Sequence, residues 1–191
     1  MADELFDREL TEHQEVAQAV RAELVAPFGV MRGLWAKTVR GGGKILFFGN
    51  GGSAGDSQHL ATELAIRYSR DRKAIAAIAL TTDSSALTAA GNDLGFERIF
   101  ARQIEAIGRP GDLALGISTS GKSPNVLAAL KTAREMGLAT AAFTGGGPHQ
   151  LAALCDCLLA VPSTVTARIQ EMHITLGQML CAALESDLGL V

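Results

Sequence analysis

The chain has 191 residues, of which 48% are apolar and 5% aromatic, and its formal net charge is -3 at pH 7. This length suits one well-cored domain, and the apolar content excludes a disordered, low-complexity chain. Lysines and arginines are scattered along the chain, so the basic surface of a nucleic-acid or membrane-surface binder is not expected. No apolar stretch approaches the ~20 residues of a membrane span, and the acidic N-terminus is unlike a signal peptide. We expect a soluble, cytoplasmic protein with no nucleic-acid or membrane partner.

Two amphipathic helices are predicted first, over residues 3–25 and 30–40, because apolar side chains recur there at helical spacing. Five apolar runs of strand length follow, at residues 44–48, 74–80, 112–117, 139–143 and 157–161. Helical patterns lie between or after them, at residues 53–68, 96–107, 123–136 and 166–188. This alternation predicts an α/β fold, a parallel sheet with helices on both faces. We expect one folding unit, made of an N-terminal helical arm (1–40) and a domain (41–191).

The loop after the third predicted strand is rich in hydroxyl groups. Ser123 suits the N-cap of the next helix, and Pro124 suits its first position. Free amides at a helix N-terminus attract anions, and hydroxyls can donate hydrogen bonds to phosphate oxygens. The hydroxyl-bearing residues are Ser118, Thr119, Ser120 and Ser123. The loop therefore predicts a phosphate site, with an ordinary capped turn as the structural alternative.

The same loop permits a second interpretation. Residues 116–123 satisfy the P-loop pattern GxxxxGK[ST] between a strand and a helix. A P-loop enzyme also needs an aspartate at the end of another apolar strand to hold Mg²⁺. Asp83 is the only candidate, and a P-loop phosphotransferase therefore stays open as an alternative.

Glycines dominate the loop after the first predicted strand, residues 49–55, where the backbone can approach a ligand closely. The helix that follows carries His59, Glu63 and Arg67 at i, i+4 and i+8, so these side chains share one stripe. His59 and Glu63 could share a metal or a proton, whereas a solvated face with a Glu–Arg pair is the simpler alternative. Ligands bind at the carboxyl ends of parallel strands, so we expect this helix to begin beside the hydroxyl-rich loop.

Two further polar groups are less specific. Asn92 and Asp93 follow a small-residue segment, 84–91, and could form an ordinary turn. The motif RIQEMH begins the last predicted helix and could be its exposed face. Its polar members are Arg168, Gln170, Glu171 and His173.

Four segments carry a resemblance to a known family: GNGGSAGDSQHLATEL, ALTTDSSALTAAGNDLGF, GDLALGISTSGKSPNV and TARIQEMH. In this order and spacing they resemble the phosphoheptose isomerases, which are sugar isomerase (SIS) domain enzymes, across nearly the whole chain. The resemblance implies a flavodoxin-like five-stranded parallel sheet and a homotetramer with active sites between subunits. It also implies isomerisation of sedoheptulose 7-phosphate to D-glycero-D-manno-heptose 7-phosphate, a precursor for lipopolysaccharide or related glycans.

The resemblance assigns roles by position. Sugar contacts are implied at Asn50, Gly51, Gly52, Asn92 and Asp93, and phosphate contacts at Ser118, Thr119, Ser120 and Ser123. Zinc ligands are implied at His59, Glu63 and Gln170, and Gln170 is also expected to take part in binding and catalysis. Moving the carbonyl from C2 to C1 needs a base that takes the C1 proton and returns it at C2 through an enediol. Glu63 is the candidate base.

One position departs from the family pattern. Members usually carry a histidine eight residues after Gln170, as zinc ligand and acid/base, and here that residue is Gln178. Glutamine does not shuttle protons near neutral pH, and zinc prefers nitrogen or sulfur donors to an amide oxygen. His173 lies about 140° around the helix and is no direct substitute.

Gln178 also keeps a non-catalytic alternative open. An SIS-domain regulator that associates with the bacterial replication initiator lacks the histidine as well. That regulator also lacks a glutamate matching Glu63, so an enzyme remains the expectation for this chain.

Overall fold

The protein is described here by a computed structural model that covers residues 2–147 and 150–191. The strands are β1 (Ile45–Gly49), β2 (Ala77–Ala79), β3 (Leu113–Ser118), β4 (Ala139–Thr144) and β5 (Cys157–Ala160). The α-helices are α1 (Ala2–Glu23), α2 (Val25–Arg40), α3 (Gly52–Ala65), α4 (Ser84–Asp93), α5 (Ile99–Ile107), α6 (Pro124–Glu135) and α7 (Thr166–Asp187). Short 3-10 turns are η1 (Phe96–Arg98) and η2 (Gln150–Ala153).

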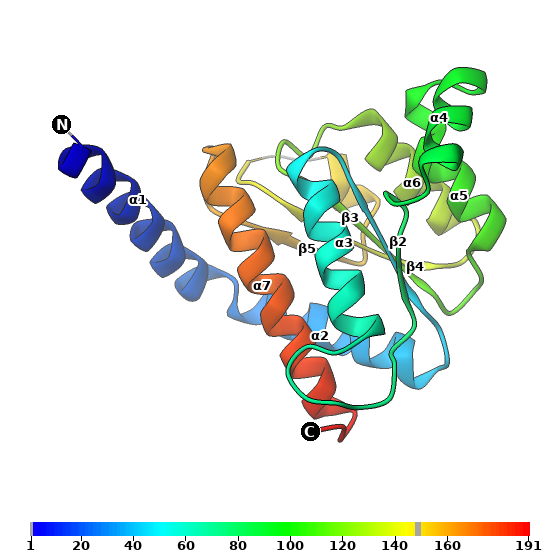
Figure 1. Cartoon of the computed structure of the whole chain (residues 1–191), viewed down its shortest axis with the longest axis horizontal. Coiled ribbons are helices and arrows are strands. Elements are labelled where there is room, and N and C mark those ends of the chain that lie inside the picture. Colours follow the sequence, from blue (N-terminus) through cyan, green and yellow to red (C-terminus); the bar gives the residue numbers. More distant parts are fainter. Residues whose placement is uncertain (1, 148–149) are drawn as a thin grey trace.

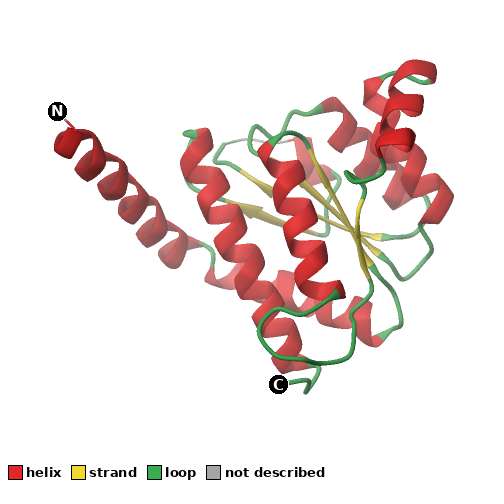
Figure 2. Cartoon of the chain, viewed as in Figure 1, coloured by secondary structure: helices red, strands yellow, loops and turns green. Residues whose placement is uncertain are grey.

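All strand pairs are parallel, and the order across the sheet is β2-β1-β3-β4-β5. This is the flavodoxin-like doubly wound order. Helices cover both faces of the sheet, whereas α1 extends away from the main body (Figures 1 and 2). The predicted α/β fold with a five-stranded parallel sheet and an N-terminal helical arm is confirmed.

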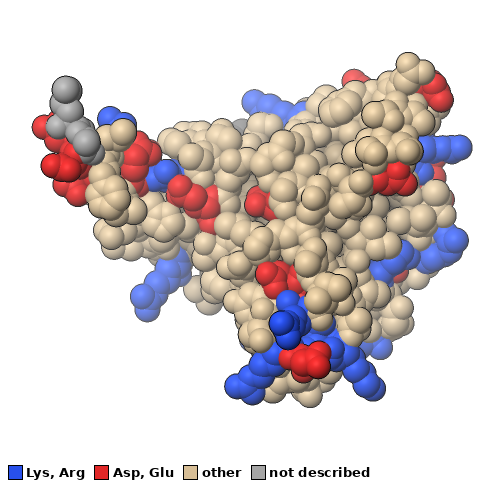
Figure 3. Space-filling model, in the orientation of Figure 1, with Lys and Arg blue, Asp and Glu red and all other residues tan. Residues whose placement is uncertain are grey.

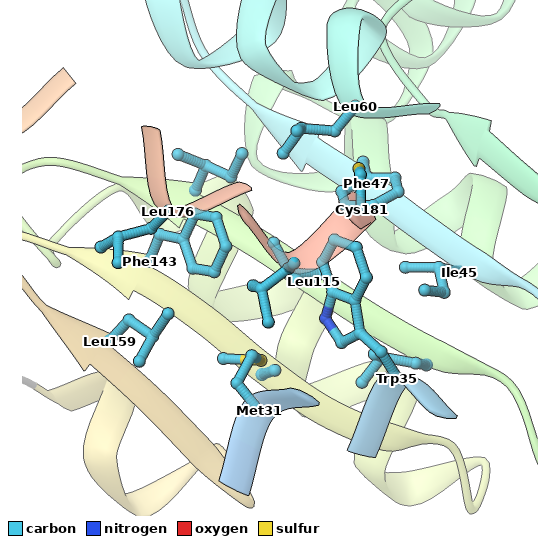
Figure 4. Close-up of a cluster of buried hydrophobic side chains, with 14 of the residues drawn as sticks. Met31, Trp35, Ile45, Phe47, Leu60, Leu115, Phe143, Leu159, Leu176 and Cys181 are labelled. Atoms are coloured by element: carbon cyan, nitrogen blue, oxygen red, sulfur yellow. The ribbon is translucent and has the colours of Figure 1, made fainter. Parts of the chain in front are cut away.

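Alternate side chains of the strands fill two separate cores. Phe47 packs with α2, α3 and α7 on one face (Figure 4), where the ring of Trp35 meets it edge-on at 5.5 Å. Phe48 points to the opposite face and packs with residues of α5 and α6, with Phe100 at 5.6 Å. Each strand is therefore apolar on both sides, which is typical of a parallel sheet buried between two helical layers.

The structure differs from the sequence prediction around β2. Residues 84–93, for which no helix was predicted, form helix α4, so Asn92 and Asp93 lie at the end of a helix and not in a separate turn. The side chain of Asp83 accepts a hydrogen bond from the backbone N–H of Ala86 (2.9 Å) and caps the helix. The strand before it has three residues where seven were expected. Helix α3 ends at Ala65, three residues before the predicted end.

Acidic and basic side chains are interspersed over the face shown in Figure 3. Within the described ranges, none of the helices is both long enough and apolar enough to cross a bilayer. Large apolar side chains are exposed on α1, where Leu5 is 52% and Phe6 is 64% exposed.

Candidate active site

The loops after β1 and β3 leave the same edge of the sheet, side by side. Gly49 and Ile117 are paired in the register of these two neighbouring strands. From β1 the chain crosses to β2 on one side, and it later returns to place β3 on the other side. The gap between β1 and β3 is therefore the topological switch point, where ligands bind in doubly wound sheets.

A pair of carboxamides joins the two loops. Asn50 Nδ2 donates to Asn125 Oδ1 (2.9 Å), and Asn125 Nδ2 donates to Asn50 Oδ1 (2.8 Å). Asn50 was predicted as a sugar contact, whereas Asn125, in the first turn of α6 and 2% exposed, was missed. Its only signal in the sequence is a polar residue beside Pro124 at the start of a helix whose inner face is otherwise apolar.

Residues 118–123, called here the serine turn, form a compact hydroxyl-lined loop. Ser118 Oγ and Ser123 Oγ lie 3.0 Å apart, and the backbone N–H of Lys122 donates to Ser120 Oγ (3.2 Å). Gly121 has φ +64°, a conformation that glycine adopts without strain. The hydroxyls and the first amides of α6 therefore gather where an anion can be held.

More hydroxyl groups face the serine turn from the loop between β5 and α7. A hollow of about 230 Å³ is lined by Thr119, Ser120 and Lys122 on one side and by Ser163, Thr164 and Thr166 on the other. This second group of hydroxyls was not predicted from the sequence. Its members precede or begin α7, so only the fold brings them to the serine turn.

Helix α3 presents one polar stripe toward α7. His59 Nε2 lies 3.0 Å from Glu63 Oε1, one helical turn apart. Gln178 of α7 places its side-chain Nε2 3.2 Å from the same His59 nitrogen. Three of the residues predicted as metal ligands therefore meet at one point between α3 and α7.

Gln170 lies apart from this group. A Cβ added at Gly52 would lie 2.3 Å from Gln170 Nε2, so the glutamine amide packs directly on the first turn of α3. Gln170 and Gln178 are separated by eight residues, about 12 Å along the helix. Gln170 therefore faces the loop after β1, whereas Gln178 faces His59 and Glu63. Within residues 2–147 and 150–191, no group of three or more His, Cys, Asp and Glu side chains is arranged to hold a metal.

Asp56 lies on the same stripe, between these two contacts. Burial raises the pKa of its carboxyl from 3.8 to about 6, and the nearby His59 acts in the opposite direction. Its Oδ2 atom is buried without a hydrogen-bond partner. Carboxyl groups with a raised pKa are common at functional sites.

Asn92 and Asp93 are at the exposed end of α4, where Asn92 Nδ2 donates to Asp93 Oδ1 (2.7 Å). Helix α4 packs against α5 and η1, on the opposite face of the sheet from α3. In the parts of the chain that the structure describes, no hydrogen bond or ion pair joins these residues to the serine turn or to Glu63. A single chain does not bring them together with the other predicted sugar contacts.

Two of the four polar residues in the motif RIQEMH, Arg168 and His173, are buried, so this motif is not simply the exposed face of α7. Arg168 is 6% exposed and pairs with Glu9 of α1 and Glu171. His173 is fully buried, and its Nε2–H donates to the carbonyl oxygen of Thr144 (3.0 Å). Burial lowers the pKa of His173 to about 4, so this imidazole is neutral near pH 7.

The geometry does not support a P-loop site. Asp83 uses its carboxylate to cap α4. The strand before it, β2, borders β1 and is not adjacent to β3, which carries the serine turn. The aspartate required to hold Mg²⁺ is therefore engaged elsewhere.

Comparisons with known proteins point to one family. The SIS domain family model matches residues 10–145. The chain is 56% identical over 181 residues to the phosphoheptose isomerase of Paramagnetospirillum magneticum, covering 95% of this chain and 94% of that protein. It is 51% identical over 183 residues to phosphoheptose isomerase 1 of Campylobacter jejuni, covering 96% and 98%.

Solved structures agree with these sequence matches. The phosphoheptose isomerase structure from Neisseria gonorrhoeae superposes with a TM-score of 0.91 at 42% identity, covering 97% of this chain and 100% of that one. The structure from Francisella tularensis gives a TM-score of 0.94 at 31% identity, covering 97% and 99%.

Proposed function

The chain belongs to the SIS domain family and, within it, to the phosphoheptose isomerases, and from this premise we propose that it converts sedoheptulose 7-phosphate to D-glycero-D-manno-heptose 7-phosphate. The product would supply the heptose of lipopolysaccharide or a related glycan. One observation carries the proposal: the Asn50–Asn125 pair joins the first turn of α6, directly after the serine turn, to the loop that begins α3. An anion site and the carboxylate-bearing helix are thereby held at one edge of the sheet.

The serine turn is the proposed phosphate site. Ser118, Thr119, Ser120 and Ser123 would donate hydrogen bonds to the phosphate oxygens, assisted by the amides at the start of α6. Gripping the phosphate supplies binding energy far from the reacting carbons, which orients those carbons for the reaction. Asn50, Gly51 and Gly52 would then contact the sugar chain.

Glu63 is the proposed base. Its carboxylate takes the proton from C1 of the ketose to give an enediolate. The aldose forms when this proton returns at C2 and the hydroxyl proton of O1 passes to O2. The contact with His59 (3.0 Å) holds this carboxylate toward α7. Gln170 is proposed to donate a hydrogen bond from its amide to the enediolate oxygen, because that amide packs beside Gly52 in the sugar-contacting loop.

Zinc is proposed as a weakly held cofactor. The convergence of His59, Glu63 and Gln178 supports three protein donors, since rotating the Gln178 carboxamide by 180° presents its oxygen to the same point. Gln170 would be a fourth zinc ligand only if its amide moved away from Gly52. A carboxamide oxygen is a poorer zinc ligand than an imidazole. Bound zinc would supply Lewis-acid polarisation of the substrate oxygen.

A homotetramer with sites between subunits is also proposed. Asn92 and Asp93 lie on the face of the sheet opposite Glu63, so they could join a site only by way of a second copy. An apolar groove of about 540 Å³ runs between α1, α2 and α7, and the exposed apolar side chains of α1 suit such a surface in another copy. Within each copy, residues 1–40 would form the arm and residues 41–191 the SIS domain of one folding unit. Because a phosphorylated sugar is charged and does not cross a bilayer freely, we propose that the enzyme acts in the cytoplasm.

The test follows aldose formation from sedoheptulose 7-phosphate by the purified protein and by Glu63→Gln. Loss of the base predicts a fall in kcat of about 10²- to 10⁴-fold, with the oligomer unchanged on size-exclusion chromatography with light scattering. The matched control is Glu135→Gln, an exposed glutamate at the end of α6 (65% exposed side chain), which should keep full activity.

Two results would contradict the proposal. Full turnover by Glu63→Gln would remove Glu63 from the mechanism. Absence of aldose with the wild-type protein, with and without added zinc, would favour the non-catalytic SIS binding module instead.

A further inference from the structure

A buried ion pair lies at the end of α3 opposite the serine turn. Arg72, in the segment between α3 and β2, donates from Nε to Glu185 Oε1 (2.7 Å). Each of the two side chains is 1% exposed. The pair joins residues 113 positions apart in the chain and connects this segment to α7.

The same guanidinium also binds the backbone of the proposed base. Arg72 donates to the carbonyl oxygens of Glu63 and Leu64, each at 2.7 Å. These are among the last carbonyls of α3, which have no partner within the helix. A positive charge at a helix C-terminus is also favourable to the helix dipole. Arg72 therefore fixes the final turn of α3 at the residue that carries the carboxylate.

On the other helix, the pair fixes the position of α7. Glu185 follows Gln178 by seven residues, or about two turns of one helix. The backbone N–H of Tyr68 also donates to Glu185 Oε1 (3.3 Å). One planar guanidinium thus contacts both helices, α3 and α7, on which His59, Glu63 and Gln178 meet.

We propose that Arg72 is a positioning residue for the isomerisation, which sets the place of the Glu63 carboxylate relative to α7 by binding the Glu63 carbonyl and the Glu185 carboxylate together. This inference rests on the proposed function. Glu63 lies in the last turns of α3, one helical turn after His59. A shift or rotation of the last turn of α3 would therefore move the Glu63 carboxylate directly. A misplacement of about 1 Å is enough to reduce turnover by about 100-fold.

The chemistry of the pair supports a positioning role. Burying two charges costs desolvation energy, and apolar residues of similar volume often stabilise a fold equally well. An arginine in this place supplies what an apolar residue cannot, a rigid fork of donors that reaches the Glu185 carboxylate and several backbone carbonyls at once. A lysine would keep the positive charge, but its single side-chain nitrogen would not bind all of these acceptors.

A second ion pair, between Arg32 of α2 and Asp187 of α7, provides the control. Arg32 donates to both carboxylate oxygens of Asp187, at 2.7 and 2.6 Å. Asp187 lies two residues beyond Glu185, but its partner is on α2. This pair holds the end of α7 without touching α3.

The experiment compares Arg72→Lys, Glu185→Gln and Arg32→Lys by kcat, KM and thermal midpoint. Arg72→Lys should lower kcat by about 10- to 100-fold, with KM nearly unchanged because the serine turn lies at the far end of α3. Glu185→Gln leaves a buried guanidinium without its counter-charge and should lower the thermal midpoint most, but should lower kcat less, because the contact with the Glu63 carbonyl remains. Arg32→Lys should leave kcat unchanged. The order of the kcat losses should thus differ from the order of the losses in stability, which a purely structural role would not produce.

Wild-type kcat in folded Arg72→Lys would overturn the proposal, as would kcat falling in step with the thermal midpoint across the three variants. If Arg72→Lys does not fold, the comparison of Glu185→Gln with Arg32→Lys decides whether kcat falls in step with the thermal midpoint. If the wild-type protein forms no aldose, the proposed function fails, and a crystal structure of Arg72→Lys decides the positioning separately. A changed position of the Glu63 carboxylate relative to His59 and to Gln178 of α7 is expected there, and unchanged His59–Glu63 and His59–Gln178 contacts (3.0 and 3.2 Å) would refute the inference.

Discussion

The contact between α3 and α7 makes a specific prediction for Gly177. A Cβ added at this position would lie 2.6 and 2.7 Å from the two methyl carbons of Leu60. Leu60 is fully buried in the core beneath both helices. In Gly177→Ala, either the Leu60 side chain leaves its rotamer or the two helices separate.

The magnitude follows from two opposing effects. Replacing glycine by alanine inside a helix stabilises the protein by about 0.5–1 kcal/mol. Overpacking a full core costs about 1–3 kcal/mol. Gly177→Ala should therefore lower the free energy of unfolding by between about 0 and 2.5 kcal/mol.

Gly33 supplies the control that isolates the packing cost. It is also inside a helix, α2, but an added Cβ there meets no atom within 4 Å. Gly33→Ala should gain about 0.5–1 kcal/mol from helix propensity alone. Urea unfolding of both variants, at one protein concentration, should thus differ by about 1–3 kcal/mol. Equal stability of Gly177→Ala and Gly33→Ala would refute the reasoning.

Two further predictions concern single side chains. Gln178→His should tighten zinc binding, because imidazole is a better zinc donor than a carboxamide, and metal analysis after dialysis should show more zinc retained than in wild type; equal retention would contradict the proposed metal position. The stability of the wild-type protein should fall between about pH 6.5 and 4, because His173, with its folded pKa lowered to about 4, takes up a proton more readily when unfolded. This contribution, up to about 3 kcal/mol, should vanish in His173→Gln in urea titrations at pH 7 and 4.5. Asp56, whose pKa is raised to about 6, acts in the opposite direction in both proteins and cancels in the comparison.

The fold and part of the candidate site could be predicted from local patterns in the sequence. Apolar runs between glycine-rich loops predicted the strands, and the strand order followed from the resemblance to the isomerases. The spacing of His59 and Glu63 predicted a shared stripe, and the structure places them in contact. These features depend on residues within about one helical turn or one strand of each other, for which spacing is informative.

Contacts between distant segments could not be predicted in the same way. Nothing near Asn125 indicates that its partner is Asn50, 75 positions earlier. Arg72 gave no signal, because a lone arginine in a connecting segment is most often solvated. The helix at residues 84–93 was also missed, since its small residues lack the apolar periodicity that marks a helix and its cap is a single aspartate.

The reciprocal hydrogen bonds between the carboxamides of Asn50 and Asn125 preorganise the proposed sugar site. Because each amide already satisfies the other, the two halves of the binding edge are set before any sugar arrives, and little ordering entropy remains to oppose association. Carboxamides do not titrate, so this link between the two loops persists in mild acid and mild alkali. A pH profile of turnover would therefore report the protonation of groups on the helices and not the loss of the hydrogen bonds between Asn50 and Asn125.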